Sequence, residues 1–321
     1  MTISVLGAGA FGTALAITFA RGEHNVILWG RNLDAVQDMR NTRENKTYLA
    51  GISFPESLEV THDLKLALSS DIICLSVPMQ KLGTLLSSFS DRLENKKILA
   101  CCKGIHLATS EGPSALISKY LPGSTVAVLT GPSFARDMAE GLPTALTLAC
   151  KKPEVCEFLQ ESLSTKMLRI YRTTDVKGAE LGGALKNVIA IACGVAIGAG
   201  YGESARAALM TRGYSEILQI ALLLGAEETT LCGLSGFGDL CLTCMSSTSR
   251  NFSYGFALGR GVQFDASITV EGISTATAAL RHSELTKLDM PIIRLVHQLA
   301  TGTANVTDAL QILMSRPQKR E

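Results

Sequence analysis

The chain has 321 residues, 46% of them hydrophobic, and a mean hydropathy of +0.24, which predicts a globular protein of about two domains. Its 30 basic and 29 acidic residues leave a net charge of +1, without the basic block that binding to a run of nucleic-acid phosphates requires. We find no charged leader and no stretch that looks fit to span a bilayer, so we expect a cytoplasmic protein without a membrane segment.

Short apolar runs alternate with helical patterns through the first half of the chain. The predicted strands lie at residues 2–6, 25–29, 71–77, 97–102, 125–130 and 144–150. This alternation is typical of an α/β domain built on a parallel sheet. Between the strands, Gly22 predicts the end of the first helix and Pro113 the start of another.

A glycine-rich turn follows the first strand, in the sequence "ISVLGAGAFGTALA". Gly7, Gly9 and Gly12 form G-x-G-x-x-G directly before an apolar helix. The first glycine allows a tight turn, the second lets the backbone approach a pyrophosphate, and the third lets helix and strand pack closely. We therefore predict a dinucleotide site; the alternative is a tight turn without a ligand.

The second strand ends in "LWGRN", where NAD-binding domains usually place an acidic residue for the ribose 2′-hydroxyl. Arg31 stands at that point, and its guanidinium suits a 2′-phosphate. This favours acceptance of NADP(H), with an ordinary surface arginine as the alternative.

Two later loops add polar groups at the predicted carboxyl edge of the sheet. "CCKGIH" contains Lys103, and "LTGPSFARD" contains Gly131 and Ser133. Each loop fits a ligand site, and each equally fits ordinary turn chemistry.

The second half changes character, because nearly everything from Val176 onward has helical spacing. We place a domain boundary near Thr174, with a dinucleotide-binding domain at 1–174, a helical domain at 175–321 and a cleft between them. Lys186 interrupts the apolar run "ELGGALKNVIAIACGVAIGAG" early in the first helix of the second domain. A buried ammonium needs a partner, so Lys186 either faces a ligand site or extends to water.

A polar, glycine-rich stretch, "GLSGFGDLCLTCMSSTSRN", lies between the later helices. Asp239 follows its glycines, and Ser249, Arg250 and Asn251 begin a new helix that can bind one phosphate. An N-cap with a solvent-exposed arginine explains the same residues equally well.

The nine cysteines are scattered through apolar segments, as expected for reduced thiols. Cys241 and Cys244 form a C-x-x-C without a second pair at zinc spacing, so we expect no metal site.

Together these motifs resemble the NAD(P)-dependent glycerol-3-phosphate dehydrogenases of the bacterial single-chain type. "GAGAFGTALA", "GPSFARDMAEGLPTA", "LGGALKNVIAIACG", "GFGDL" and "SRN" occur in the family's order and with similar spacing. The resemblance implies a Rossmann-type parallel-sheet domain followed by an all-helical domain, as in 6-phosphogluconate dehydrogenase-like enzymes. Ala10 and Phe11 depart mildly from the family's commoner serine and aromatic pair, which leaves the backbone donors of the turn in place.

The resemblance also implies roles for the site residues. Lys186 would transfer the proton, with Lys103 and Asp239 as the other catalytic residues. The substrate-binding residues would be Lys103, Gly131, Ser133, Asn187, Asp239, Thr243, Ser249, Arg250 and Asn251. The cofactor-binding residues would be Gly7, Gly9, Ala10, Phe11, Gly12, Arg31, Lys103, Ala135, Arg250 and Glu271.

The implied reaction is reversible reduction of dihydroxyacetone phosphate by NADPH or NADH to sn-glycerol 3-phosphate, a phospholipid precursor, in a homodimer. A β-hydroxyacid dehydrogenase shares the fold and the helix lysine but gives no reason for "TSRN". A redox sensor that binds NAD(P)H without catalysis needs no buried lysine.

Overall fold

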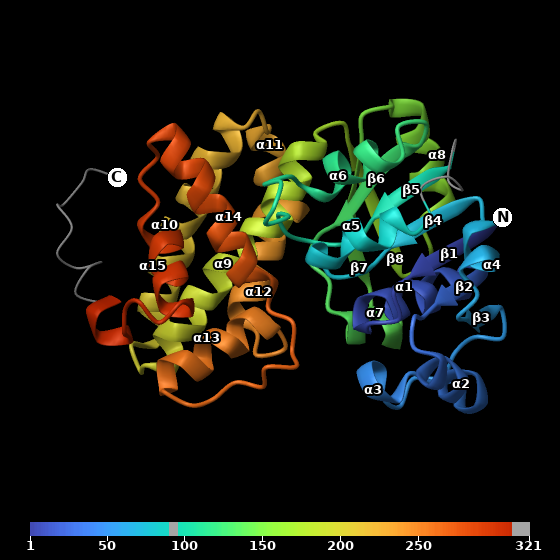
Figure 1. Ribbon diagram of the computed structural model, residues 1–321, viewed down its shortest axis with the longest axis horizontal. Helices are drawn as coiled ribbons and strands as arrows, with labels where there is room; N and C mark the ends of the chain where they lie inside the picture. The colour runs from blue at the N-terminus through green and yellow to red at the C-terminus, as the bar shows by residue number, and fades with distance from the viewer. Residues whose placement is uncertain (90–95, 310–321) are drawn as a thin grey trace. The chain divides into compact units, whose positions relative to one another are not determined.

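The computed structural model describes residues 1–89 and 96–309 of the chain. The fold divides into two compact units: unit 1 comprises residues 1–103 and 112–180, and unit 2 comprises residues 104–111 and those from 181 onward. Figure 1 shows the elements of both units, which are described separately below. The domain boundaries predicted from the sequence, 1–174 and 175–321, remain a prediction, because these units are defined by contacts and not by function.

Unit 1 is built on one sheet in the order β3-β2-β1-β4-β5-β6-β7-β8. Several of its strands are buried along all or nearly all of their length and are near-continuous apolar runs, as a sheet covered on both faces requires. The strands are β1 (Thr2–Leu6), β2 (Asn25–Trp29), β3 (Leu58–Thr61), β4 (Ile72–Leu75), β5 (Lys97–Ala100), β6 (Thr125–Thr130), β7 (Thr144–Cys150) and β8 (Leu168–Thr173).

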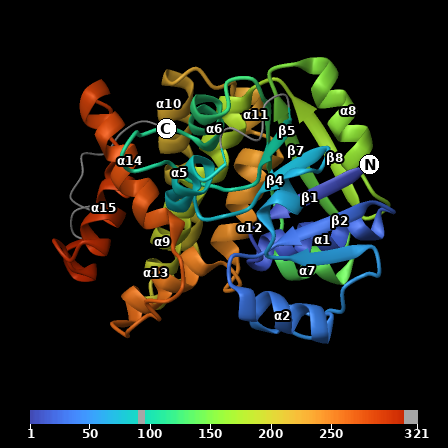
Figure 2. The same cartoon turned by 45° about the vertical axis from the view of Figure 1, so that its right-hand side comes forward.

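Helices cover both faces of this sheet, as Figures 1 and 2 show. Alternate strand residues, such as Val5 and Leu6, belong to the hydrophobic cores on opposite faces. One core includes residues of α1 (Ala10–Arg21), α2 (Leu33–Thr42), α3 (Lys46–Leu49), α7 (Ala135–Glu140) and α8 (Pro153–Leu163). The other includes residues of α4 (Leu64–Leu68), α5 (Met79–Ser87), α6 (Pro113–Tyr120) and the first turn of α9 (Val176–Gly198).

The sheet confirms the predicted Rossmann-type domain and adds two features. Strands β3 and β8 have no counterpart among the predicted runs, and β7 runs antiparallel to β6. The six-residue helix α7 connects β6 to β7 and is only about 9 Å long, shorter than either strand. The chain re-enters the sheet beside β6 in the opposite direction, so this connection is not a parallel crossover.

The predicted helix ends are found, with one difference in backbone geometry. Helix α6 starts at Pro113, and α1 ends at Arg21 with Gly22 as its C-cap. Gly22 has φ of −83°, whereas Glu23 takes the left-handed conformation with φ of 65°. A Cβ at position 22 would lie 2.7 Å from the Cγ2 atom of Thr165, so a larger residue there would displace that side chain.

Unit 2 contains helices and no strand among its described residues. They are the greater part of α9, then α10 (Gly202–Leu223), α11 (Glu228–Leu231), the π-helical segment η2 (Leu234–Gly238), α12 (Asp239–Met245), α13 (Arg250–Arg260), α14 (Glu271–Thr286) and α15 (Pro291–Ala300). Helix α9 is long and apolar enough to cross a membrane, but 83% of its most apolar window is buried inside the protein, as in a core helix.

Helices α9 and α13 cross unusually closely. A Cβ at Gly194 would lie 2.1 Å from the carbonyl oxygen of Phe252, and one at Gly255 would lie 2.0 Å from that of Ile191. These glycines bring the two helix backbones into contact.

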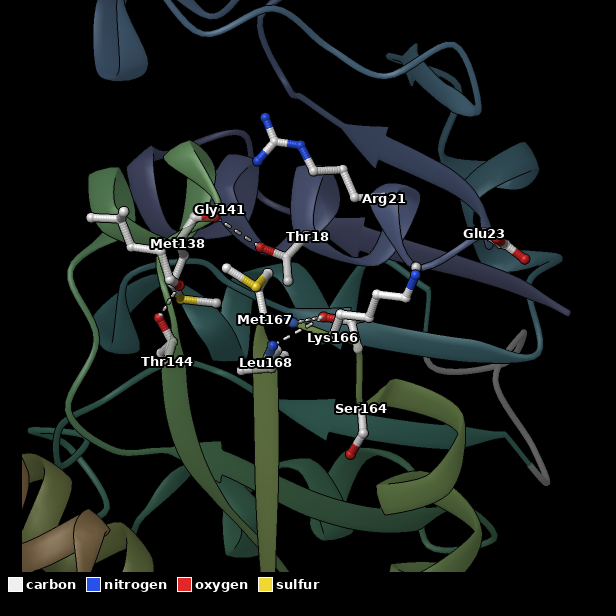
Figure 3. Close-up of a pocket in the computed structure, with 13 residues that line it drawn as sticks. Thr18, Arg21, Glu23, Met138, Gly141, Thr144, Ser164, Lys166, Met167 and Leu168 are labelled. Atoms are coloured by element: carbon white, nitrogen blue, oxygen red, sulfur yellow. Dashed lines mark hydrogen bonds between the residues drawn. The ribbon is translucent and has the colours of Figure 1, made fainter.

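A surface pocket of about 450 Å³ lies in unit 1, among the ends of α1 and α7 and the starts of β7 and β8 (Figure 3). Met138, Leu142 and Met167 supply its apolar lining, and Arg21 and Lys166 its cations. None of the predicted site residues lines this pocket.

Candidate active site

The lysine in the apolar helix is compensated by a buried carboxylate. The ammonium of Lys186 donates to Oδ1 of Asp239 at 2.5 Å and to Oγ1 of Thr243 at 2.6 Å. The side chains of Lys186 and Asp239 are only 7% and 1% exposed. The hydroxyl of Thr243 also lies 3.4 Å from Oδ1 of Asp239 and donates to it, which closes a triangle of polar contacts. Lys186 therefore does not extend to water.

Local sequence explains why these groups meet. Asp239 and Thr243 are four residues apart on α12, so they share one face of that helix. Gly182 lies one turn before Lys186 on α9, and a Cβ there would lie 2.6 Å from the carbonyl oxygen of Ser235. The glycine thus lets η2, which leads directly into Asp239, pack against the face of α9 that carries Lys186. π-Helical segments of this kind are frequent at functional sites.

The thiols beside this triangle do not compete with Asp239 for the lysine. Burial and a hydrogen bond with Cys193 raise the pKa of Cys244 well above its usual range, although the Lys186 ammonium opposes the rise. Burial also raises the pKa of Cys241. Both thiols of the C-x-x-C sequence therefore stay protonated at neutral pH, and all nine cysteines of the chain are free.

Two asparagines link three helices of unit 2. The side-chain amide of Asn251 donates to Oδ1 of Asn187 at 2.9 Å, and its own oxygen accepts from the backbone N–H of Gly272 at 3.0 Å. Asn187 follows Lys186 on α9, Asn251 lies on α13, and Gly272 follows Glu271 at the start of α14. The amide chain thus fixes the start of α14, where the predicted cofactor contact Glu271 lies, to the helix of the lysine.

The start of α13 combines a side-chain N-cap with an exposed arginine. Ser249 is buried and its hydroxyl accepts from the backbone N–H of Phe252 at 3.3 Å, so it is the N-cap of the helix. Arg250, the first helical residue, is exposed. The structure thus contains the N-cap and the solvent-exposed arginine that explain this sequence without a ligand. A helix N-terminus with an exposed guanidinium also suits a phosphate.

The glycine turn of unit 1 has the shape that a pyrophosphate requires. Gly7 has φ of +122°, and a Cβ on it would lie 2.4 Å from the carbonyl oxygen of Ser76. A Cβ on Gly12 would lie 2.0 Å from the carbonyl oxygen of Gly7, whereas one on Gly9 would meet nothing within 4 Å. The turn is therefore tightly packed on the protein side and open above Gly9. Since the first turn of α1 carries no acidic residue, its N-terminus fits an anion.

A second group of predicted residues gathers around Lys103 in unit 1. Its ammonium donates to the carbonyl oxygen of Gly131 at 3.2 Å and lies 5.9 Å from the ring centre of Phe11. The hydroxyl of Ser133 donates to the same carbonyl at 3.3 Å. Gly131 has φ of +138°, which favours glycine at this position. Lys103 thus connects the loop after β6 with the residue that follows Ala10 at the start of α1.

Two further predicted cofactor residues belong to unit 1. Arg31 is exposed in the link between β2 and α2, directly before Asn32, whose side chain caps α2. Ala135 begins α7 and packs against the core of unit 1. Among the described residues, no group of three or more His, Cys, Asp or Glu side chains could hold a metal ion.

Comparison with known proteins identifies the family. Residues 2–156 match the family model of the NAD-dependent glycerol-3-phosphate dehydrogenase N-terminus, and residues 175–311 match that of the C-terminus. The chain belongs to this family. This membership disfavours the β-hydroxyacid dehydrogenase and redox-sensor alternatives.

Similar proteins share the full length of the chain. It is 53% identical to glycerol-3-phosphate dehydrogenase (NAD(P)+) of Ruegeria sp. (strain TM1040), with all of both chains covered. It is 54% identical to the protein of that name from Cereibacter sphaeroides, with 99% of this chain and 100% of the relative covered. The crystal structure of glycerol-3-phosphate dehydrogenase from Coxiella burnetii is 34% identical, with a TM-score of 0.93, and the match covers 98% of this chain and 99% of that one.

Proposed function

We propose that this chain catalyses the reversible NAD(P)H-dependent reduction of dihydroxyacetone phosphate to sn-glycerol 3-phosphate. The buried contact of Lys186 with Asp239 and Thr243 carries the proposal. The full-length relatives named glycerol-3-phosphate dehydrogenase (NAD(P)+) support the same reaction.

Reduction of a ketone adds a hydride to carbon and a proton to oxygen. NAD(P)H supplies the hydride when bound. The Lys186 ammonium donates the proton to the ketone oxygen, and in the reverse direction the neutral amine takes a proton from the hydroxyl. The Asp239 carboxylate favours the charged form of the lysine, and its bond at 2.5 Å directs the ammonium. Such general acid catalysis contributes about 10²- to 10⁴-fold in rate.

In this proposal the substrate phosphate binds at the start of α13. Arg250 supplies a guanidinium, and the N-terminus of the helix favours negative charge. Ser249 contributes through its hydroxyl hydrogen, because its side-chain oxygen already accepts from Phe252 and its backbone N–H already donates to the carbonyl oxygen of Ser246. The side-chain nitrogen of Asn251 donates one of its hydrogens to Asn187, and in this proposal it donates the other to the phosphate. Thr243 supports Lys186, and Lys103, Gly131 and Ser133 complete the proposed substrate-binding residues.

The proposed cofactor site begins at the glycine turn, where the open space above Gly9 fits a pyrophosphate. Arg31 would pair with the 2′-phosphate of NADPH, which is why we propose that NADPH is accepted. The other residues assigned to the cofactor are Gly7, Ala10, Phe11, Gly12, Lys103, Ala135, Arg250 and Glu271.

We assign the chain to the cytoplasm as a homodimer that supplies sn-glycerol 3-phosphate for phospholipid synthesis.

A single assay separates the proposed reaction from its rivals. Loss of NADPH absorbance is followed with dihydroxyacetone phosphate and with dihydroxyacetone, and reduction of NADP+ is followed with a β-hydroxy acid. We expect turnover with the phosphorylated ketone and little with the other two substrates. Binding of NADPH without turnover would support a sensor, and turnover of the β-hydroxy acid would contradict the proposal.

A further inference from the structure

A buried asparagine outside every predicted motif contacts the glycine turn. Asn45 lies in the link between α2 and α3 and is only 4% exposed. Its side-chain nitrogen donates to the carbonyl oxygen of Ala8 at 3.1 Å and to Oγ1 of Thr13 at 2.8 Å. Ala8 stands between Gly7 and Gly9 of the turn, and Thr13 follows Gly12. The amide orientation is unambiguous, because a carbonyl oxygen can only accept.

The contact with Ala8 determines where the turn points its next donor. The peptide between Ala8 and Gly9 is trans, so its C=O and N–H point in opposite directions. Since the Ala8 oxygen is directed at Asn45, the Gly9 N–H is directed away from it. The contact with Thr13 fixes the same asparagine to the first turn of α1, in which the Thr13 N–H donates to the Gly9 oxygen at 2.9 Å.

The segment that carries Asn45 is itself anchored. The backbone oxygen of Asn45 accepts from the N–H of Leu49 at 2.8 Å, and Leu49 is buried in the core of unit 1. Two residues earlier, the guanidinium of Arg43 donates to the carbonyl oxygens of Leu58 and Pro55. Asn45 therefore reaches the turn from a fixed support.

We propose that Asn45 is a positioning residue for cofactor binding, which holds the Ala8–Gly9 peptide so that the Gly9 N–H donates to the pyrophosphate. The role rests on the proposed use of NAD(P)H. Asn45 does not itself contact the cofactor, so its loss should weaken ligands that contain the pyrophosphate and spare fragments that lack it.

The test compares two ligands on N45A. Affinity for NADPH is measured by its fluorescence, and affinity for 2′-AMP, which has the 2′-phosphate but no 5′-phosphate, by calorimetry. We expect NADPH to bind at least tenfold more weakly and 2′-AMP to bind within twofold of the wild type. N41A is the matched control, because Asn41 is exposed and, within the part of the chain that the structure describes, its side chain accepts only from Gln37 of the same helix; N41A should leave both affinities unchanged.

A second variant covers the case in which N45A does not fold. N45L keeps a side chain of similar size without either donated hydrogen bond and adds no charge that could repel the pyrophosphate, so we expect the same loss of NADPH affinity. NADPH affinity within twofold of wild type in the folded variant, or equal losses for both ligands, would overturn the role of Asn45. Failure of the wild type to bind either ligand would instead contradict the proposed cofactor site.

Discussion

Removing the charge of Asp239 while Lys186 remains is the most informative perturbation of the site. At 2.5 Å and an effective dielectric constant of about 20, two unit charges attract by about 7 kcal/mol. Desolvation of both ions offsets much of this attraction, but breaking a buried pair by removing one partner costs about 3 to 5 kcal/mol. We therefore expect Asp239→Asn to lower the free energy of unfolding by about 3 kcal/mol, since it leaves an ammonium buried without its carboxylate.

A double-mutant cycle tests this reasoning. Lys186→Met alone leaves the carboxylate buried without its ammonium, so it too should be costly, whereas the double variant leaves neither charge. The double variant should therefore be about 3 kcal/mol more stable than the sum of the two single changes predicts. Urea unfolding should be followed by far-UV circular dichroism. The fluorescence of the single tryptophan, Trp29, would report on unit 1, whereas Lys186 and Asp239 lie in unit 2.

An exposed ion pair supplies the control. Arg136 and Glu140 lie 2.7 Å apart with side chains that are 57% and 40% exposed, so the corresponding cycle at this pair should give less than about 1 kcal/mol. Additive effects of the changes at Lys186 and Asp239, within about 0.5 kcal/mol, would refute a buried, strongly coupled pair.

Three further predictions follow from the two units. Arg250→Ala should lower kcat/KM for dihydroxyacetone phosphate at least tenfold, since a charge-assisted hydrogen bond contributes about 1.5 to 3 kcal/mol; an equal loss on unphosphorylated dihydroxyacetone, with NADPH affinity intact, would exclude a phosphate contact. Arg31→Asp should shift the ratio of kcat/KM values from NADPH toward NADH, and an unchanged ratio would place Arg31 away from the ribose. Burial raises the pKa of Glu180 from 4.5 to about 7 although its carboxylate accepts from Ser114. The folded state therefore binds this proton more tightly, and the stability that Glu180 contributes is present below pH 4.5 and falls as the pH rises to about 7. Glu180→Gln should remove that fall from urea unfolding curves between pH 4.5 and 7, and identical slopes with and without Glu180 would contradict the shift.

The parts of the fold that could be predicted are those set by local sequence. Gly7, Gly9 and Gly12 act within one turn, and the helix starts at Pro113 and Arg250 depend on neighbouring residues. The antiparallel β7 could not be predicted in this way, because its direction is set by its pairing with β6 and not by the pattern of its own residues. Strand β3, with the sequence LEVT, includes the exposed Glu59, so it shows no continuous apolar run like those of the predicted strands.

The site shows the same limit. The sequence shows that Lys186 needs a partner, but Asp239 lies 53 residues away and was assigned through the family resemblance. Asn45 was missed because its partners lie 37 and 32 residues earlier, and no motif marks an asparagine between two helices. Contacts of this kind depend on the packing of distant elements, which periodicity and spacing do not determine.

The central claim is that Lys186 supplies the proton in ketone reduction, and the turnover of Lys186→Met tests it most directly. Steady-state reduction of dihydroxyacetone phosphate should be measured at saturating NADPH, together with NADPH affinity by fluorescence on the same folded preparation. Because the glycine turn lies in the other unit, NADPH affinity should stay within about twofold of the wild type, while kcat falls by about 10²- to 10⁴-fold. Near-normal kcat with normal substrate affinity would contradict the account, since Lys186 would then be a structural residue.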